Sequence, residues 1–392
     1  MEIKEFLQVM VDKEASDVYL TVASPPMYRI EGVVQPIGDF KFKPAELEAL
    51  AKSVMNERQW EEFSSKLEMD LVLVLSIPDL SRFRVNILRQ RGSIALVIRK
   101  IKFEVRSLDE LKLPPVLKDV AVKKNGLTLV VGATGSGKST TLAAMIDYRN
   151  SWGPGHIISV EDPIEFVHRH KKCIVTQREL GFDTHSFADA LKHAVRQAPD
   201  VILIGEIRDK ESMEAAITFA DTGHLCLGTL HSTNANQSFE RILNFFPAER
   251  HAQILMHLSL NLRAIISQRL IPSVDGMRVP AIEIMIDTPR IKDLIKQGEI
   301  ETIKEAMEQG TNEGCQTFDQ ALFALYKEGK ITLEQALMNS DSANNLRLKI
   351  KLEGLSGDEA LDALSTKGQG RAHAGGLNIA GAKPGGTNFR RI

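Results

Sequence analysis

The stretch GLTLVVGATGSGKST, residues 126–140, decides the fold of the central part of the chain. An apolar run at 126–131 leads directly into the pattern G-x-x-x-x-G-K-[ST] at 132–139. A buried strand, a glycine-rich turn and a helix in this order form a phosphate-binding loop, because successive backbone N–H groups and the helix N-terminus face one anion. The stretch therefore predicts an α/β domain that binds a nucleoside triphosphate with Mg²⁺.

The positions of this loop have separate predicted roles. Lys138 is expected to contact the β- and γ-phosphates, Ser139 to ligate Mg²⁺ through its hydroxyl, and Thr140 to support the neighbouring phosphates. The residues expected to hold the nucleotide are Gly132, Thr134, Gly135, Ser136, Gly137, Lys138, Ser139 and Thr140. The predicted cofactors are ATP and Mg²⁺.

Strands alternate with helices on the C-terminal side of the loop. Strands are predicted in GLTLVVG, HIISVED, VILIGE and HLCLGTLH, and helices from Lys138, in SFADALKHAVRQ, after Arg208 and from Asn236. Short apolar strands that alternate with helices indicate a parallel sheet covered on both faces. We expect this domain to span 116–288.

The flanking regions have different patterns. Residues 1–102 predict a small mixed α/β domain with helical periodicity from Lys43 to Lys66 and a hairpin, SRFRVNILRQ with GSIALVIRKI, that turns near Gln90 to Gly92. Residues 103–115, with two consecutive prolines, predict a linker. Residues 289–352 predict a helical C-terminal subdomain, and 353–392 a mostly disordered, glycine-rich tail.

Acidic residues follow two of the predicted strands. Glu206 ends VILIGE, so it is expected at the C-terminal edge of the sheet, where it can deprotonate the water that attacks the γ-phosphate. Glu161, Asp162 and Glu165 lie in ISVEDPIEF, and we favour Glu165 for Mg²⁺ coordination, directly or through water, and for polarising the nucleophile. A helix cap or a surface charge is the structural alternative for each of these acids.

Two histidines stand at opposite ends of one predicted strand, TGHLCLGTLHS at 222–232. His224 and His231 are seven residues apart and cannot ligate one metal from an extended strand. Imidazole is a neutral donor near pH 7, so one of them is a candidate to sense the γ-phosphate or to link the site to a neighbouring subunit.

Composition restricts the function classes. The chain has 392 residues, with 49 basic against 51 acidic side chains and a net charge of −2, so no global charge attracts it to nucleic acid. The three cysteines show no C-x-x-C spacing, which argues against a disulfide framework and favours a reducing cytoplasm. The N-terminus has no secretory pattern, and no run reaches 18 apolar residues.

Four segments together carry a family resemblance. GATGSGKST, ISVEDPIEF, VILIGEIRD and TGHLCLGTLHSTNA resemble, in this order, the Walker A, aspartate, Walker B and histidine boxes of the secretion-ATPase superfamily. From residue 1 to about 350 the chain resembles the type IV pilus retraction ATPases, the PilT/PilU family. TPRIKDLIKQGEIETIKEAMEQG and EGCQTFDQALF are more similar to the PilU branch than to the PilT branch, which carries AIRNLI where this chain reads DTPRIKDLI.

The resemblance implies a PAS-like N-terminal domain, a RecA-like P-loop ATPase domain with a helical C-terminal subdomain, and a homo-hexamer with ATP between neighbouring domains. It implies arginine fingers at Arg84 and Arg99, which we expect at opposite ends of the predicted hairpin. The implied function is pilus retraction beside a PilT-like motor. The implied partner is an inner-membrane platform protein, with the ATPase peripheral to the cytoplasmic face of that membrane.

Two alternatives remain open from the sequence. A RecA-like nucleic-acid translocase would share the phosphate loop, but basic and aromatic residues should line its track, and only 6% of this chain is aromatic. A regulatory subunit would bind nucleotide with little hydrolysis, although here the expected catalytic positions are all filled. An assembly ATPase of the same superfamily typically has a four-cysteine metal site, which this sequence lacks.

Overall fold

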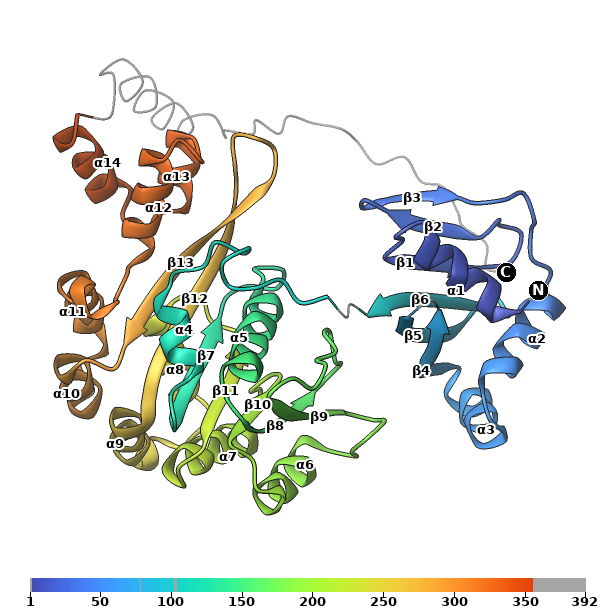
Figure 1. Cartoon of the computed structure of the whole chain (residues 1–392), viewed down its shortest axis with the longest axis horizontal. Coiled ribbons are helices and arrows are strands. Elements are labelled where there is room, and N and C mark those ends of the chain that lie inside the picture. Colours follow the sequence, from blue (N-terminus) through green and yellow to red (C-terminus); the bar gives the residue numbers. More distant parts are fainter. Residues whose placement is uncertain (1, 78, 102–103, 355–392) are drawn as a thin grey trace, which may run out of the picture. The chain divides into compact units, whose positions relative to one another are not determined.

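The computed structural model describes residues 2–77, 79–101 and 104–354 (Figure 1). The described chain forms two compact units. One contains the residues up to Leu270 and from Ile282 to Thr317, and the other those from Ile271 to Ala281 and from Phe318 onward. None of the described helices combines the length and the hydropathy that a membrane span requires.

The N-terminal region forms a six-stranded sheet in the order β3-β2-β1-β6-β5-β4, with helices packed on it. Its elements are α1 Ile3–Asp12, β1 Asp17–Leu20, β2 Met27–Ile30, β3 Val33–Pro36, α2 Pro44–Val54, α3 Glu57–Lys66, β4 Glu68–Ile77, β5 Asp79–Gln90 and β6 Ser93–Ile101. All described pairings in this sheet are antiparallel. Phe63, Phe83 and Leu96 lie in its separate hydrophobic core. The mixture of helices and strands predicted for this region is observed.

The helical period predicted from Lys43 to Lys66 contains a break. Met55 is extended, with φ −112° and ψ 144°, and it ends α2. The Asn56 side chain then accepts a hydrogen bond from the Gln59 N–H and caps α3. Asparagine is among the preferred N-cap residues, so the cap starts a new helix inside a stretch with a continuous apolar period.

The second sheet has seven strands in the order β13-β12-β7-β11-β10-β8-β9. Its strands are β7 Gly126–Val131, β8 Gly155–Glu161, β9 Cys173–Glu179, β10 Val201–Ile204, β11 Leu225–Leu230, β12 Leu262–Pro272 and β13 Arg278–Ile286. The pairings of β7 with β11 and β12, of β10 with β11 and β8, and of β8 with β9 are parallel. The parallel sheet is as predicted, but strands β9, β12 and β13 were not predicted.

Helices cover both faces of this sheet (Figure 1). Leu127, Leu129 and Val131 of β7 point into one core, and Val130 into the other. One core contains α4 Val116–Ala121 and α5 Lys138–Trp152, and the other α6 Phe187–Ala194, α7 Lys210–Asp221, α8 Ala235–Leu243, α9 His251–Asn261, α10 Pro289–Gln297 and α11 Ile303–Gln309. Alternate side chains are buried on both faces, as in sheets that helices enclose.

The C-terminal region divides after α11. Residues of α10 and α11 share the core of the parallel sheet, so the expected 289–352 subdomain contains two packing units. Helices α12 Phe318–Lys327, α13 Leu333–Asn339 and α14 Ala343–Leu352 form a core with Ile271 and Ala281 of the β12–β13 pair. Of the predicted tail, only Glu353 and Gly354 belong to the described residues.

Candidate nucleotide site

The glycine-rich turn between β7 and α5 needs glycine for two different reasons. Gly132 has φ +149°, and a Cβ there would lie 2.5 Å from Ser136 Oγ and 2.6 Å from the backbone oxygen of Gln268. Gly135 has φ +79° but open space around it. Only glycine adopts both conformations without strain. Without side chains at these positions, the backbone of the turn can approach a bound phosphate closely.

Lys138 is the first residue of α5 and is 9% exposed. Its Nζ donates to the backbone oxygens of Gly132, at 2.9 Å, and Ala133, at 3.1 Å, so the ammonium lies inside the turn. Burial lowers the pKa of Lys138, and the negative charges of Glu206 and Glu165 raise it. Both predicted carboxylates are therefore close enough to Lys138 for their charges to act on its ammonium group.

Gln268 of β12 lies beneath the phosphate loop and was not predicted. It is 4% exposed, and its Oε1 accepts a hydrogen bond of 2.7 Å from the Thr141 hydroxyl of α5. A Cβ on Gly137 would lie 2.6 Å from its Nε2. The sequence signal was available: Ser267 and Gln268 form a polar pair inside the apolar run LRAIISQRLIP.

The C-terminal ends of β10 and β11 bring Glu206 and His231 together. Glu206 Oε1 lies 3.2 Å from His231 Nε2, and its Oε2 lies 3.0 Å from Arg208 Nε. Arg208 also pairs with Asp162 at 2.8 Å. Because β10, β11 and β8 are parallel, their following residues meet at one edge, which is also the edge of the phosphate loop.

The connection 162–172 between β8 and β9, here called the carboxylate loop, carries Glu165, which is exposed. Glu161 ends β8 directly before it. Burial raises the pKa of Glu161 to about 7, and hydrogen bonds from Ser159 and Gln177 oppose that rise. The structure therefore distinguishes the two glutamates of this segment by environment: one is exposed, and the other is desolvated.

The remaining predicted residues lie elsewhere in the fold. His224 precedes β11, so it lies at the opposite sheet edge from His231, and its Nδ1 is 3.2 Å from the Phe219 backbone oxygen. Arg84 and Arg99 are direct cross-strand partners on β5 and β6. The expectation that these arginines lie at opposite ends of the hairpin was wrong, because the turn at Arg91–Gly92 places residue 84 opposite residue 99.

Both arginines pair with carboxylates of the N-terminal sheet. Arg99 Nε lies 2.7 Å from Asp17 Oδ1, and its side chain is 71% exposed. Arg84 Nε lies 3.8 Å from Asp70 Oδ1. The two arginines are therefore neighbours on one face of the sheet, each beside its own carboxylate.

The residues present fit a nucleotide with Mg²⁺. Gly137 caps α5 without a side-chain hydrogen bond, which leaves the first N–H groups of the helix for an anion, and Ser136 Oγ is buried without a partner. The described residues contain no group of three or more His, Cys, Asp or Glu side chains that could hold a metal ion. Mg²⁺ bound by Ser139, a carboxylate, phosphates and water requires no such group.

Comparison with known proteins identifies the relatives. Residues 1–353 match the family described as Type II/IV secretion system protein. The chain is 49% identical to the Type IV pilus ATPase PilU of Pseudomonas aeruginosa over 391 residues, which cover 100% of both chains. It is 43% identical to the Type IV pilus retractation ATPase PilT of the same organism, over 86% of this chain and 97% of that protein.

Solved structures agree with these relatives. The pilus retraction motor PilT with bound ADP superposes with a TM-score of 0.81 at 42% identity, covering 87% of this chain and 98% of that one. The Legionella pneumophila ATPase DotB superposes with a TM-score of 0.75 at 25% identity, covering 86% of this chain and 94% of that one. The resemblance found from the four sequence segments is confirmed. The chain belongs to the type II/IV secretion system protein family, in the PilT/PilU group of type IV pilus ATPases.

Proposed function

We propose that the chain is an ATP-hydrolysing motor for type IV pilus retraction, acting as a PilU-type accessory to a PilT-type motor. The observation that carries this proposal is the gathering of Lys138, Glu206 and His231 at one sheet edge, where the charges of Glu206 and Glu165 act on Lys138. The 49% identity to PilU over the full length supports the accessory assignment.

The proposed chemistry divides the work among these side chains. Lys138 and the N–H groups of α5 bind the phosphates. Glu206 orients the attacking water and accepts its proton, while His231, 3.2 Å from the Glu206 carboxylate, fixes the orientation of that carboxylate. Ser139 and Glu165 would hold Mg²⁺, which when bound neutralises charge on the β- and γ-phosphates.

We propose that the active assembly is a homo-hexamer. The Arg84–Arg99 pair would then act as arginine fingers on a nucleotide between subunits, and a finger contributes a factor of about 10³ to 10⁵ in rate. His224, which is at the far edge of the sheet, fits a contact with a neighbouring subunit better than a contact with its own phosphate loop. Sequential opening and closing of the interfaces would convert hydrolysis into movement.

The rest of the assignment follows the family. We propose that the N-terminal sheet is PAS-like, and that the parallel sheet is a RecA-like domain, with boundaries at 102, 116 and 288. The partner would be an inner-membrane platform protein of the pilus, and the site of action the cytoplasmic face of that membrane. The net charge of −2 does not favour a nucleic-acid track.

The test compares two variants of the purified full-length protein. Lys138→Ala is expected to lose nucleotide binding, because the ammonium lies inside the phosphate loop. Glu206→Gln is expected to bind ATP but to hydrolyse it at least ~100-fold more slowly, as the loss of a general base requires. Binding is measured with a fluorescent ADP analogue and turnover by phosphate release. Undiminished hydrolysis in Lys138→Ala would reject the site.

A further inference from the structure

The carboxylate loop has no helix or strand of its own over 162–172, although it carries a predicted catalytic side chain. A loop this long has no backbone ladder to fix its shape, so side chains from other elements must do so. Two carboxamides, one from each neighbouring element, bond to the loop backbone, and the Glu179 carboxylate of β9 accepts a further bond from the Ile164 N–H at 3.3 Å. The two carboxamides are Asn150 of α5 and Gln177 of β9.

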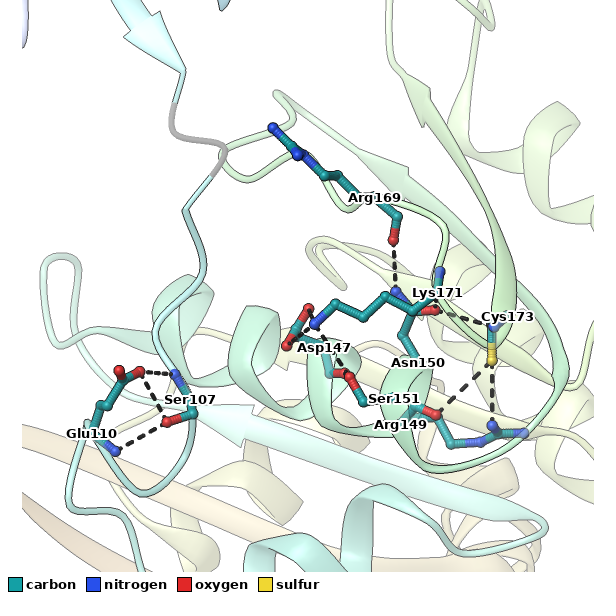
Figure 2. Close-up of polar contacts among 9 residues, drawn as sticks. All are labelled: Ser107, Glu110, Asp147, Arg149, Asn150, Ser151, Arg169, Lys171 and Cys173. Carbon is teal, nitrogen blue, oxygen red and sulfur yellow. Dashed lines mark hydrogen bonds and ion pairs between the residues drawn. The ribbon is translucent and has the colours of Figure 1, made fainter. Parts of the chain in front are cut away.

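Asn150 holds the C-terminal part of the loop against α5, as Figure 2 shows. It is fully buried, and its Nδ2 donates to the Arg169 backbone oxygen at 2.8 Å. Its Oδ1 accepts hydrogen bonds from the backbone N–H groups of Lys171 and Cys173, each at 3.2 Å. An ion pair between Lys171 and Asp147 lies over the same contact at 2.7 Å. These hydrogen bonds hold residues 169–173 against α5, the helix that follows the phosphate loop.

Gln177 holds the part of the loop that carries Glu165. Its Nε2 donates to the backbone oxygen of Phe166, the next residue, at 2.9 Å and to Glu161 Oε1 at 3.2 Å. Its Oε1 accepts from the His168 N–H at 2.8 Å. One carboxamide therefore contacts the backbone beside Glu165 and the side chain of Glu161.

We propose that Gln177 is a positioning residue that fixes Glu161 and Glu165 relative to each other for ATP hydrolysis. This inference rests on the proposed function. None of the three hydrogen bonds described for Gln177 reaches the phosphate loop or Lys138, so removal of this side chain should misplace the carboxylates and leave nucleotide binding intact. Misplacement of about 1 Å at a reacting group costs up to about 100-fold in rate.

The experiment measures kcat, the KM for ATP and the affinity for ADP in full-length variants. Gln177→Met keeps the length of the side chain and removes all three hydrogen bonds. Gln177→Glu keeps the acceptor for His168 and, when ionised, cannot donate to Phe166 or Glu161. Both variants are expected to lower kcat about 10- to 100-fold with KM and ADP affinity within about twofold of wild type.

The matched control is Lys171→Met, which removes the Lys171–Asp147 ion pair from the same loop but no contact of Gln177. Its kcat should stay within about twofold of wild type, since exposed ion pairs contribute little. The inference is overturned if kcat is unchanged in both Gln177 variants, if KM and ADP affinity change as much as kcat, or if Lys171→Met is equally slow. A wild-type chain that binds no nucleotide would instead overturn the proposed function and this inference together.

Discussion

The phosphate loop and the start of the carboxylate loop lie at the same edge of the parallel sheet, but the shapes of the two loops have different origins. The phosphate loop is specified by its own residues: Gly132 and Gly137 adopt positive φ, and Lys138 bonds back to the loop backbone. The carboxylate loop is specified by Asn150 and Gln177, which lie outside it. The phosphate loop can therefore be recognised from a local sequence pattern. The shape of the carboxylate loop depends instead on packing against elements that are distant in the sequence.

The largest expected effect follows from the space around one glycine. Gly132→Ala places a Cβ 2.6 Å from the Gln268 backbone oxygen at φ +149°, so it adds both overpacking and backbone strain. Together these cost several kcal/mol, and we expect nucleotide affinity to fall about 100-fold or more, measured by titration with a fluorescent ADP analogue.

The matched variant is Gly135→Ala, because Gly135 also has positive φ but no atom within 4 Å of a Cβ. It carries the strain alone, so its loss of affinity should be clearly smaller. Equal losses would mean that close packing against Gln268 does not shape the phosphate loop.

The second-largest expected effect concerns the carboxylate loop. Asn150→Ala leaves the Cys173 N–H, the Lys171 N–H and the Arg169 oxygen without their carboxamide partner. We expect the free energy of unfolding to fall by about 3 kcal/mol, measured by urea denaturation, because one buried and two part-buried backbone groups lose a hydrogen-bond partner.

Ser151→Ala is the control for this substitution. Ser151 is the next residue, but it is exposed, and we expect a change within about 0.5 kcal/mol. If Asn150→Ala were as stable as this control, the carboxylate loop would not depend on α5 for its shape.

The smallest effect is a pH dependence of stability. Burial, together with the charges of Glu165 and Glu179, raises the pKa of Glu161 from 4.5 to about 7. The folded chain therefore binds this proton more tightly than the unfolded chain, and stability falls as the pH rises from about 4.5 to about 7. Glu161→Gln removes that slope.

The measurement is the free energy of unfolding at pH 5 and at pH 8 for both proteins. The loss between the two pH values should be smaller in Glu161→Gln than in wild type by about 2 kcal/mol, since one pKa unit corresponds to about 1.4 kcal/mol. An identical loss in the two proteins would show that Glu161 is not desolvated in the folded chain.

The sequence was sufficient to predict a feature where the residues of one short segment determine its conformation. The phosphate loop, Glu206 after β10 and His231 after β11 all follow apolar strands, so their common edge could be predicted from parallel order. The sequence was insufficient for β9, whose residues CIVTQRE contain only a short apolar run, with Ile174 exposed, followed by half-buried polar side chains. Gln177 was missed for that reason, and Gln268 because its strand was not assigned.

The amino-acid sequence by itself determined the ligand class, the central strand–loop–helix unit and the family, because glycine, lysine and apolar periodicity act over a few residues. The tertiary structure alone decided that Arg84 faces Arg99, that Glu161 is desolvated, and which carboxamides hold the carboxylate loop. These properties depend on strand register and burial. Register and burial arise from contacts between segments far apart in the chain, and a local pattern does not encode them.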